Sequence, residues 1–221
     1  MGTLLLRIVA PLQSWGIQSN FTVRDSGLEP SKSGIIGLVC AALGRPRQAD
    51  LSDLSGLRMG VRVDREGILK KDYHIAQSVL KSDGKNIQNM TTNRYYLADA
   101  AFLVGLEGDS PVLQSIQAAL QHPVWPLFFG RKAFTPAAPV FLRDGLLPIE
   151  SLESAFEHFG WIVRWKNGQA PRQLRWVLEA ADGEQARADV PISFAERRFS
   201  SRRVKTIFKA APVDVSMEVQ G

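Results

Sequence analysis

Apolar residues follow three different patterns along the first part of the chain. Residues 4–10 are apolar except for Arg7, which is typical of a central strand covered on both faces. Over residues 31–43 the apolar positions recur at helical spacing, and Gly44 stands where a glycine commonly ends a helix. Residues 57–64 alternate between apolar and polar, so they predict a strand with one face in solvent.

A long polar segment follows this first strand, helix and strand. Residues 77–94 show neither period, and a polar stretch of this length inside a compact domain is usually functional or disordered. Its flanks, residues 73–80 and 90–97, are able to pair as the arms of a protruding hairpin with Asp83 and Gly84 at its tip.

A second strand and helix come after the polar segment. Residues 96–106 predict another buried strand, and residues 110–121 predict an amphipathic helix. A last strand over residues 124–129 or 140–142 would complete the order βαββαβ of a ferredoxin-like unit. Many functions occur on this fold, so function has to be argued from particular side chains.

Composition and charge favour an acidic partner. The 221 residues are 45% hydrophobic, enough for the core of one large domain or two small ones. Lys and Arg number 27 against 22 Asp and Glu, which gives a net charge of +5. Residues 96–102 lack the alternating aromatics with which a standard RNA-recognition motif stacks on bases. Any RNA binding is therefore expected to use loops and edges.

The cysteine content and the apolar runs predict a cytoplasmic protein. Cys40 is the only cysteine, so no internal disulfide is possible and a reducing compartment is expected. The amino terminus lacks a basic leader followed by a long apolar segment, and no stretch approaches the ~20 apolar residues of a membrane span.

The start of the predicted helix is a candidate anion site. The first amide N–H groups of a helix have no partner within it, and the helix dipole adds partial positive charge there. Ser31 or Ser33 is a suitable N-cap, and Arg24 and Lys32 lie nearby in sequence. The alternative is a plain capped helix with a solvated lysine.

Two other basic stretches carry aromatic neighbours. Arg131 and Lys132 follow Gly130 in an aromatic-flanked turn, where a glycine would let a phosphate reach backbone N–H groups. Residues 190–209 interleave basic residues with Phe194, Phe199 and Phe208, a usual nucleic-acid footprint, although a cationic surface strand is an equal alternative. The basic residues considered there are Arg197, Arg198, Arg202, Arg203, Lys205 and Lys209.

Metal and cofactor chemistry is not expected. The three histidines are scattered, Cys40 stands alone, and no phosphate-binding G-x-x-x-x-G-K-[ST] loop occurs. Metal-free RNA cleavage stays open, with His74 or Tyr73 accepting the 2′-OH proton and a lysine at 70 or 71 stabilising the phosphorane. The same residues would alternatively clamp RNA without cutting it, or only end a strand.

Several of these segments together resemble one family. The corner Gln13-Ser14-Trp15-Gly16 followed by the sequence Ser-Lys-Ser-Gly-Ile-Ile-Gly at 31–37 is the most specific, and residues 72–74, 94–100 and 130–132 add to it in the same order. The chain is similar to the Cas-five family of the RAMP superfamily, as found in Cascade, the type I-E CRISPR surveillance complex.

The resemblance implies an α+β fold. It would have a ferredoxin-like (RRM-like) βαββαβ body over residues 1–145, with a thumb hairpin at about 75–95. A small β-rich region would follow over residues 146–221.

The resemblance also implies a function in antiviral defence. Such subunits are non-catalytic RNA-binding proteins that hold the 5′ handle of crRNA and cap the filament of backbone subunits. They contact the large subunit that reads the PAM, and so meet target DNA only indirectly. In type I-C systems the Cas-five relative itself cuts repeat RNA, which keeps a metal-independent endoribonuclease as the alternative. A protein adaptor with no RNA role is a third possibility.

Together, the residues and the resemblance give one set of candidate RNA ligands. Trp15 would stack on a base unless it belongs to the core, and Arg94 would stack or pair at the thumb base unless it forms a surface salt bridge. The full set is Trp15, Arg24, Lys32, Ser33, His74, Arg94, Arg131, Lys132, Arg197, Arg198, Arg202 and Arg203, with no catalytic and no metal-binding residue.

Overall fold

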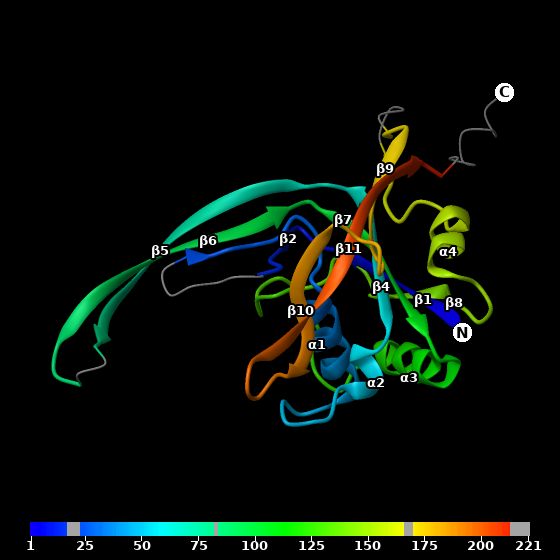
Figure 1. The fold of residues 1–221 in the computed structure, drawn as a ribbon. Coiled ribbons are helices and arrows are strands. Elements are labelled where there is room, and N and C mark those ends of the chain that lie inside the picture. The colour runs from blue at the N-terminus through cyan, green and yellow to red at the C-terminus, as the bar shows by residue number, and fades with distance from the viewer. Residues whose placement is uncertain (17–22, 82–83, 166–169, 213–221) are drawn as a thin grey trace.

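The computed structural model describes residues 1–16, 23–81, 84–165 and 170–212, which form two β-sheets and a few helices (Figure 1). The larger sheet has seven strands in the order β10-β11-β9-β4-β7-β1-β8, and all neighbouring strands are antiparallel. The fold is therefore of the α+β class. The strands are β1 (Gly2–Val9), β4 (Arg58–Arg65), β7 (Ala101–Gly108), β8 (Phe141–Leu147), β9 (Gln173–Glu179), β10 (Gln185–Ser193) and β11 (Arg198–Ala210).

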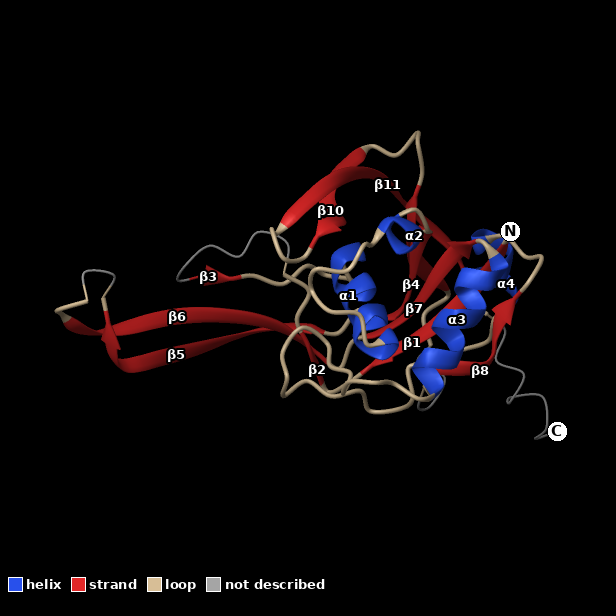
Figure 2. Ribbon diagram, turned by 90° about the horizontal axis from the view of Figure 1, so that it is seen from below, coloured by secondary structure: helices blue, strands red, loops and turns tan. Residues whose placement is uncertain are grey.

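Helices cover both faces of this sheet. On one face α1 (Lys32–Leu43) and α3 (Ser110–Gln121) lie side by side, with α2 (Ser52–Ser55) next to them (Figure 2). Because successive residues of a strand point to opposite faces, Leu4 packs in the cluster with α1 and α3, while Leu5 packs in the cluster with α4 (Leu152–His158). The prediction of a central strand buried on both faces is confirmed for β1.

The helix predicted over residues 31–43 is confirmed in its details. Ser31 is the N-cap, and its Oγ accepts a hydrogen bond from the Gly34 amide at 3.3 Å. Gly44 ends the helix with a φ of 70°, a left-handed conformation that favours glycine. The bounds predicted for α3 are those observed.

The prediction that one face of the strand over residues 57–64 lies in solvent was wrong. Arg62 in β4 is fully buried, and its guanidinium forms an ion pair with Asp64 at 2.8 Å. The same guanidinium donates to the carbonyl oxygens of Phe156, Phe159 and Gly160, at 2.7, 2.6 and 2.7 Å. Arg62 thus satisfies the carboxyl end of α4, which covers this face of β4.

A long β-hairpin projects from the body (Figure 1). Its arms, β5 (Ile68–Leu80) and β6 (Ile87–Ala98), pair antiparallel, which confirms the predicted hairpin and extends it at the base. Two short strands complete this second sheet at β6, namely β2 (Leu12–Gln13), which is antiparallel, and β3 (Val23–Arg24), which is parallel. At the predicted tip, Gly84 has a φ of 69°, and Asp83 lies outside the described residues.

The prediction of one continuous strand over residues 96–106 was also wrong, because the chain passes from one sheet to the other there. It leaves the hairpin at the end of β6, and Asp99 adopts a left-handed φ of 56° before β7 begins in the larger sheet. The Asp99 amide donates to the Pro11 carbonyl at 2.9 Å. This bend sets the hairpin against the 11–16 corner.

The carboxy-terminal strands continue the larger sheet. β9 pairs with β4, β11 pairs with β9, and β10 forms the outer edge beside α1. Of the two segments proposed for the last strand of the body, the one at 140–142 overlaps β8, and the boundary proposed after residue 145 falls inside β8. The division of the chain at that point stays a prediction. Among the described helices, none is long and apolar enough to span a membrane.

Candidate nucleic-acid interface

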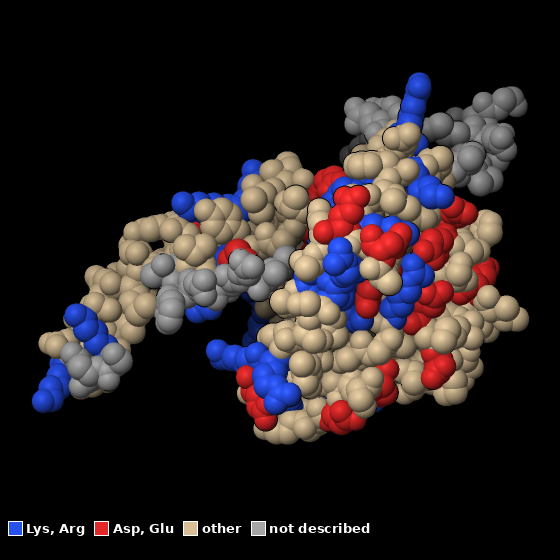
Figure 3. Space-filling view, in the orientation of Figure 1, with Lys and Arg blue, Asp and Glu red and all other residues tan. Residues whose placement is uncertain are grey.

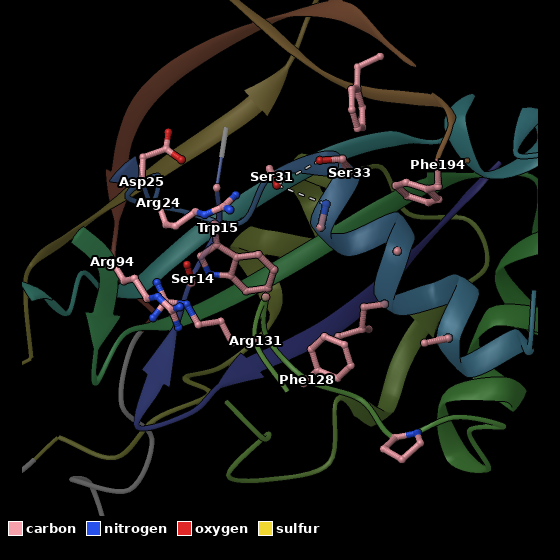
Figure 4. A pocket seen from close by; sticks show the side chains of 18 residues that line it. Ser14, Trp15, Arg24, Asp25, Ser31, Ser33, Arg94, Phe128, Arg131 and Phe194 are labelled. Carbon is pink, nitrogen blue, oxygen red and sulfur yellow. Dashed lines mark hydrogen bonds between the residues drawn. The ribbon is translucent and has the colours of Figure 1, made fainter. Parts of the chain in front are cut away.

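A pocket of about 580 Å³ opens where the base of the hairpin, the start of α1 and the turn between β10 and β11 meet (Figure 4). Segments far apart in sequence contribute to it, with arginines, phenylalanines, the Trp15 ring and small residues of α1. The lining residues are Arg24, Arg94, Arg131, Phe128, Phe194, Phe199, Ser14, Trp15, Gly16, Asp25, Ser31, Ser33, Gly34, Gly37, Leu38, Ala41, Pro126 and Gly130.

The pairing of β3 with β6 brings two of the arginines together. Arg24 in β3 is directly opposite Arg94 in β6 in the parallel register. Arg131 reaches the same strand from the 123–139 loop, and its Nη2 donates to the Tyr95 carbonyl at 3.1 Å. Its guanidinium also lies 5.3 Å from the centre of the Phe134 ring and 6.0 Å from that of Tyr96.

Gly130 places Arg131 in the pocket by allowing two backbones to approach closely. Its φ is 87°, and a Cβ atom there would lie 1.9 Å from the carbonyl oxygen of Ser14. The Ser14 amide donates to the Phe129 carbonyl at 3.1 Å, which holds the turn against the 11–16 corner. The glycine therefore serves this backbone contact, and the phosphate contact suggested by the sequence stays a prediction.

Among the described residues, no carboxylate forms an ion pair with any of the three arginines, although Asp25 lines the pocket and Asp72 is opposite Arg94 in the hairpin register. The ion pairs found in the described part of the chain involve other cations, so Arg24, Arg94 and Arg131 form none within it. Burial lowers the pKa of Arg131, and repulsion from Arg94 lowers that pKa further, although Asp72 opposes the shift. Positive charges so close to one another favour the binding of an anion.

An aromatic wall stands opposite the arginines. Phe194 and Phe199 contact each other edge to face, with ring centres 6.5 Å apart. Phe199 and Phe128 are 42% and 38% exposed, so their rings are available at the pocket surface. The sequence placed these residues in aromatic-basic stretches, but it did not identify them as pocket residues, because the fold of β10 and β11 over α1 brings them there.

The start of α1 already holds an anion of the protein. The Lys32 amide donates to Asp189 Oδ2 at 2.8 Å, so a carboxylate lies where a phosphate was expected. The Lys32 side chain is 2% exposed, and its Nζ lies 3.0 Å from Glu179 Oε2. Lys32 therefore joins α1 to β9 and does not face the pocket, whereas Ser33 lines it.

Trp15 belongs to the core at the pocket floor. It is 2% exposed, its Nε1 donates to Gln13 Oε1 at 3.1 Å, and its ring centre lies 5.7 Å from that of Phe129. A Cβ atom on Gly34 would lie 2.9 Å from this ring, so the glycine lets Trp15 pack on the helix start. The core alternative for Trp15 is the one that this geometry favours.

The basic residues of the carboxy-terminal strands separate into two kinds. Arg202 is buried and pairs with Asp189 at 2.7 Å and with Glu179 at 3.3 Å, so it is structural. Arg203 is exposed and donates to the Gly183 carbonyl at 2.7 Å. The other two cations predicted in this stretch, and the second cation of the turn at 130–132, are also exposed; these are Arg197, Arg198, which pairs with Glu196 at 2.8 Å, and Lys132.

The residues considered for RNA cleavage are divided between two faces of the hairpin. His74 lies on the face that carries Arg94 and Asp72, and its Nε2 is 2.7 Å from Asp72 Oδ2. Lys71 and Tyr73 are on the opposite face, because they alternate with these positions along β5. His74 itself does not line the pocket.

Charge is spread unevenly over the face shown in Figure 3. Lys and Arg atoms predominate on the hairpin, whereas positive and negative atoms lie side by side at the outer end of β10 and β11, over β9 and over the upper part of β11. The described residues contain no cluster of three or more His, Cys, Asp or Glu side chains that could hold a metal ion.

Known proteins resemble this chain in sequence and in fold. Residues 3–205 match the profile of the family described as CRISPR-associated protein (Cas_Cas5). The CRISPR system Cascade subunit CasD of Escherichia coli (strain K12) is 30% identical over 158 residues, which are 63% of this chain and 69% of that protein.

Two solved structures share the fold over nearly the whole chain. One, described as the crystal structure of Cas protein, is 42% identical with a TM-score of 0.79, and the match covers 95% of this chain and 97% of that one. The other is a chain of a CRISPR RNA-guided surveillance complex, 30% identical with a TM-score of 0.80, and the match covers 96% of this chain and 92% of that one.

Proposed function

Because the chain belongs to the Cas_Cas5 family of CRISPR-associated proteins, we propose that it is the Cas5-type subunit of a Cascade complex and binds crRNA through the pocket beside its hairpin. The family membership supports the proposal that the chain is part of a Cascade complex, and the pocket supports the proposal that it binds crRNA. Because these two proposals rest on different observations, they can be tested separately.

One observation carries the proposed RNA contact. Arg24, Arg94 and Arg131 converge on a pocket and form no ion pair among the described residues, while Asp25 is the one carboxylate that lines the pocket with them. Phosphate oxygens would supply the missing negative charge, and a guanidinium accepts them with two parallel hydrogen bonds. The exposed rings of Phe128 and Phe199 suit the bases of single-stranded RNA.

The finer role proposed is to hold the 5′ handle of crRNA and to cap the filament of backbone subunits. The projecting hairpin supports this role, because it extends the surface around the pocket far beyond the body (Figure 1). The large PAM-reading subunit and a backbone subunit are the protein partners proposed, and target DNA is met only through them.

We further propose that the body is ferredoxin-like. The order β8-β1-β7-β4 supports this assignment, together with the antiparallel pairing of each neighbour. The helices α1 and α3 follow β1 and β7, as the order βαββαβ requires. A cytoplasmic location is proposed with it, and the buried free thiol of Cys40 suits a reducing compartment.

Charge reversal in the turn at 130–132 tests the RNA contact. We expect a complex with Arg131→Glu and Lys132→Glu to retain much less crRNA, because repulsion replaces attraction to phosphate. The matched control is Arg143→Glu with Arg172→Glu, which makes the same change at two exposed arginines outside the pocket. Unchanged RNA content in the first variant would contradict the proposal.

Co-expression with a CRISPR repeat tests the identity of the RNA. Sequencing of the co-purified RNA is expected to recover repeat-derived 5′ ends, and ultraviolet light is expected to crosslink them to this chain. A complete absence of crosslinks would favour the adaptor alternative.

We propose a non-catalytic role, although the contact between Asp72 and His74 favours a second candidate. A carboxylate that holds an imidazole is the arrangement of a general base, which metal-independent cleavage of repeat RNA would need. We expect the purified protein to leave repeat RNA uncut in EDTA. A product with a defined 5′ end that is lost in His74→Ala would establish the endoribonuclease.

A further inference from the structure

A second pocket of about 450 Å³ lies where the hairpin leaves the body, and we call it the root pocket. Its lining joins the end of β4 and the start of β5 to the start of β9 and the end of β11, which lie together in Figure 1. None of its described lining residues belongs to the pocket with the three arginines. The root pocket is therefore a separate feature of the surface.

Large apolar side chains are exposed at the root pocket. Phe208 of β11 is 65% exposed, and Ile68, the first residue of β5, is 58% exposed. The Trp165 ring lines the same pocket and contacts Trp161 edge to face, with ring centres 5.9 Å apart. Exposed apolar groups cost free energy in water, and a group of them around a hollow commonly marks a protein interface. The root pocket therefore suits one large apolar side chain of another molecule.

The charges exposed at the root pocket are negative. Glu66 and Asp99 are exposed, whereas the two guanidiniums of the lining, from Arg65 and Arg175, are half-buried. Arg65 Nε donates to the Asp99 carbonyl, and Arg175 forms ion pairs with Glu66 and with the buried Glu29, each at 2.7 Å. Exposed carboxylates beside engaged guanidiniums disfavour RNA phosphates and favour a Lys or Arg of a partner.

Both connections between the body and the hairpin line the root pocket. Gly67, with a φ of 74°, joins β4 to β5, and Asp99, with a φ of 56°, joins β6 to β7. A Cβ atom on Gly67 would lie 2.7 Å from the Ala98 carbonyl oxygen, so the two connections pack closely. A segment in the root pocket would contact the body at Phe208 and the hairpin at Ile68. Such a segment would hold the hairpin at one angle to the body.

We propose that the root pocket binds a segment of another protein subunit, which inserts one large apolar side chain against Phe208 and Ile68. A Lys or Arg of the same segment lies beside Glu66 and Asp99. This inference rests on the proposed function, because the assembled complex supplies the subunit. The bound segment joins the hairpin to the body, and so it sets the direction in which the hairpin projects into the complex.

Photocrosslinking from two positions tests the inference. The photoreactive residue p-benzoylphenylalanine replaces Phe208 in one variant and Ile68 in another, and each variant is assembled into the complex before irradiation. We expect both probes to capture the same segment of one protein subunit, identified by mass spectrometry of the crosslinked peptides. The same probe at Ile149, which is 92% exposed and outside the root pocket, measures the background.

Charge reversal at Glu66 tests the basic residue of the segment. With the probe at position 208, Glu66→Lys is expected to lower the crosslink yield about tenfold, because repulsion replaces attraction. Glu184→Lys is the matched control, an exposed carboxylate outside the root pocket, and is expected to keep the yield. Exchange of the captured Lys or Arg for Glu is expected to restore the yield of Glu66→Lys. Glu66→Gln, which adds no repulsion toward Arg175, is expected to lower the yield even if Glu66→Lys fails to fold.

The outcomes separate this inference from the proposed function. Capture of RNA, capture of residues 213–221 of this chain, different segments from the two probes, or no capture above the background would overturn the inference while membership of the complex stands. A yield that Glu66→Lys and Glu66→Gln leave unchanged would also overturn it. A chain that fails to copurify with Cascade subunits would overturn the proposed function and the inference with it.

Discussion

Two groups of cations in this protein differ in what surrounds them. Lys32 and Arg202 are buried, and Glu179 and Asp189 neutralise them at the junction of α1 with β9, β10 and β11. The pocket arginines at 24, 94 and 131 form no ion pair among the described residues, although Asp25 lines the pocket and Asp72 is opposite Arg94. Burial lowers the pKa of Arg131, and repulsion from Arg94 lowers it further. The sequence suggested an RNA contact for all of them.

The comparison shows that residue type and local spacing do not separate a structural cation from a binding one. The Lys32 ammonium finds its carboxylate 147 positions away in sequence, and only the fold brings the two together. A cation that forms an ion pair with a carboxylate of the protein is already neutralised. Cations that lie close together without such a pair can bind an anionic ligand. Four variants test this distinction, from the largest expected effect to the smallest.

Removal of the shared carboxylate is expected to have the largest effect. Glu179→Ala leaves the Lys32 ammonium and the Arg202 guanidinium with Asp189 alone, and burial already lowers the pKa of Lys32 against the pull of Glu179. We expect the free energy of unfolding to fall by ~3–5 kcal/mol, measured by urea denaturation. Glu196→Ala is the control, because it breaks only the exposed pair with Arg198. Equal stability of the two variants would show that the buried group does not hold the fold.

A side chain at Gly130 is expected to disturb the pocket arginines through the backbone. Gly130→Ala places a Cβ atom against the Ser14 carbonyl at a φ of 87°, so we expect a loss of ~1–3 kcal/mol in the free energy of unfolding. RNA binding is expected to weaken as well, because Arg131 moves with the turn. Gly84→Ala is the control, since it has a similar φ of 69° but open space around it. If Gly130→Ala binds RNA like the unaltered protein, Arg131 does not depend on this turn.

Loss of one pocket arginine is expected to change RNA binding more than stability. Arg24→Gln breaks no ion pair of the described structure, so the free energy of unfolding should move by less than ~0.5 kcal/mol. The slope of log K against log salt for repeat RNA should become shallower by ~0.7, the amount expected for one phosphate contact on a single strand. A slope that stays the same would remove Arg24 from the interface.

The exposed ion pair between Arg45 and Asp53 lies outside the pocket, so it is expected to have the smallest effect on RNA binding and only a small one on stability. Arg45 and Asp53 are 2.5 Å apart with side chains 28% and 37% exposed, and Asp53→Asn should cost at most ~1 kcal/mol. The hydrogen bond from Arg45 lowers the pKa of Asp53 below its usual 3.8, although burial opposes the shift. Because the folded pKa is the lower one, the stabilisation is present above pH 3.8 and is lost as the pH falls through the folded value. The difference between the variant and the unaltered protein should therefore shrink in acid, and a difference that grows there would contradict the assignment.

The sequence predicted well those features that local signals determine. The N-cap Ser31, the terminal Gly44 and the bounds of α3 follow from capping and periodicity within one element. The hairpin was predicted because the two flanks of a long polar segment can pair, with a turn at Asp83 and Gly84 between them. The family resemblance led to the same fold class that the structure has.

Features that depend on distant packing could not be predicted from the sequence. Arg62 alternates with apolar neighbours like a solvent-facing residue, yet α4 covers it, because α4 is placed by contacts almost a hundred positions away. The pocket likewise requires β3, the turn at Gly130 and the β10–β11 turn to meet. Within the candidate set, the geometry brings Trp15, Arg24, Ser33, Arg94 and Arg131 to the pocket and gives Lys32 and Arg202 structural partners.

RNA content of the assembled complex tests the central claim most directly. Arg94→Gln with Arg131→Gln removes two pocket charges, and Arg143→Gln with Arg172→Gln removes two exposed charges elsewhere. Each complex is purified with its partners, and bound RNA per complex is measured beside the unfolding temperature. We expect the pocket variant to lose most of its RNA at an unchanged unfolding temperature, while the control keeps its RNA and its unfolding temperature. Equal RNA content in the two complexes would contradict the central claim.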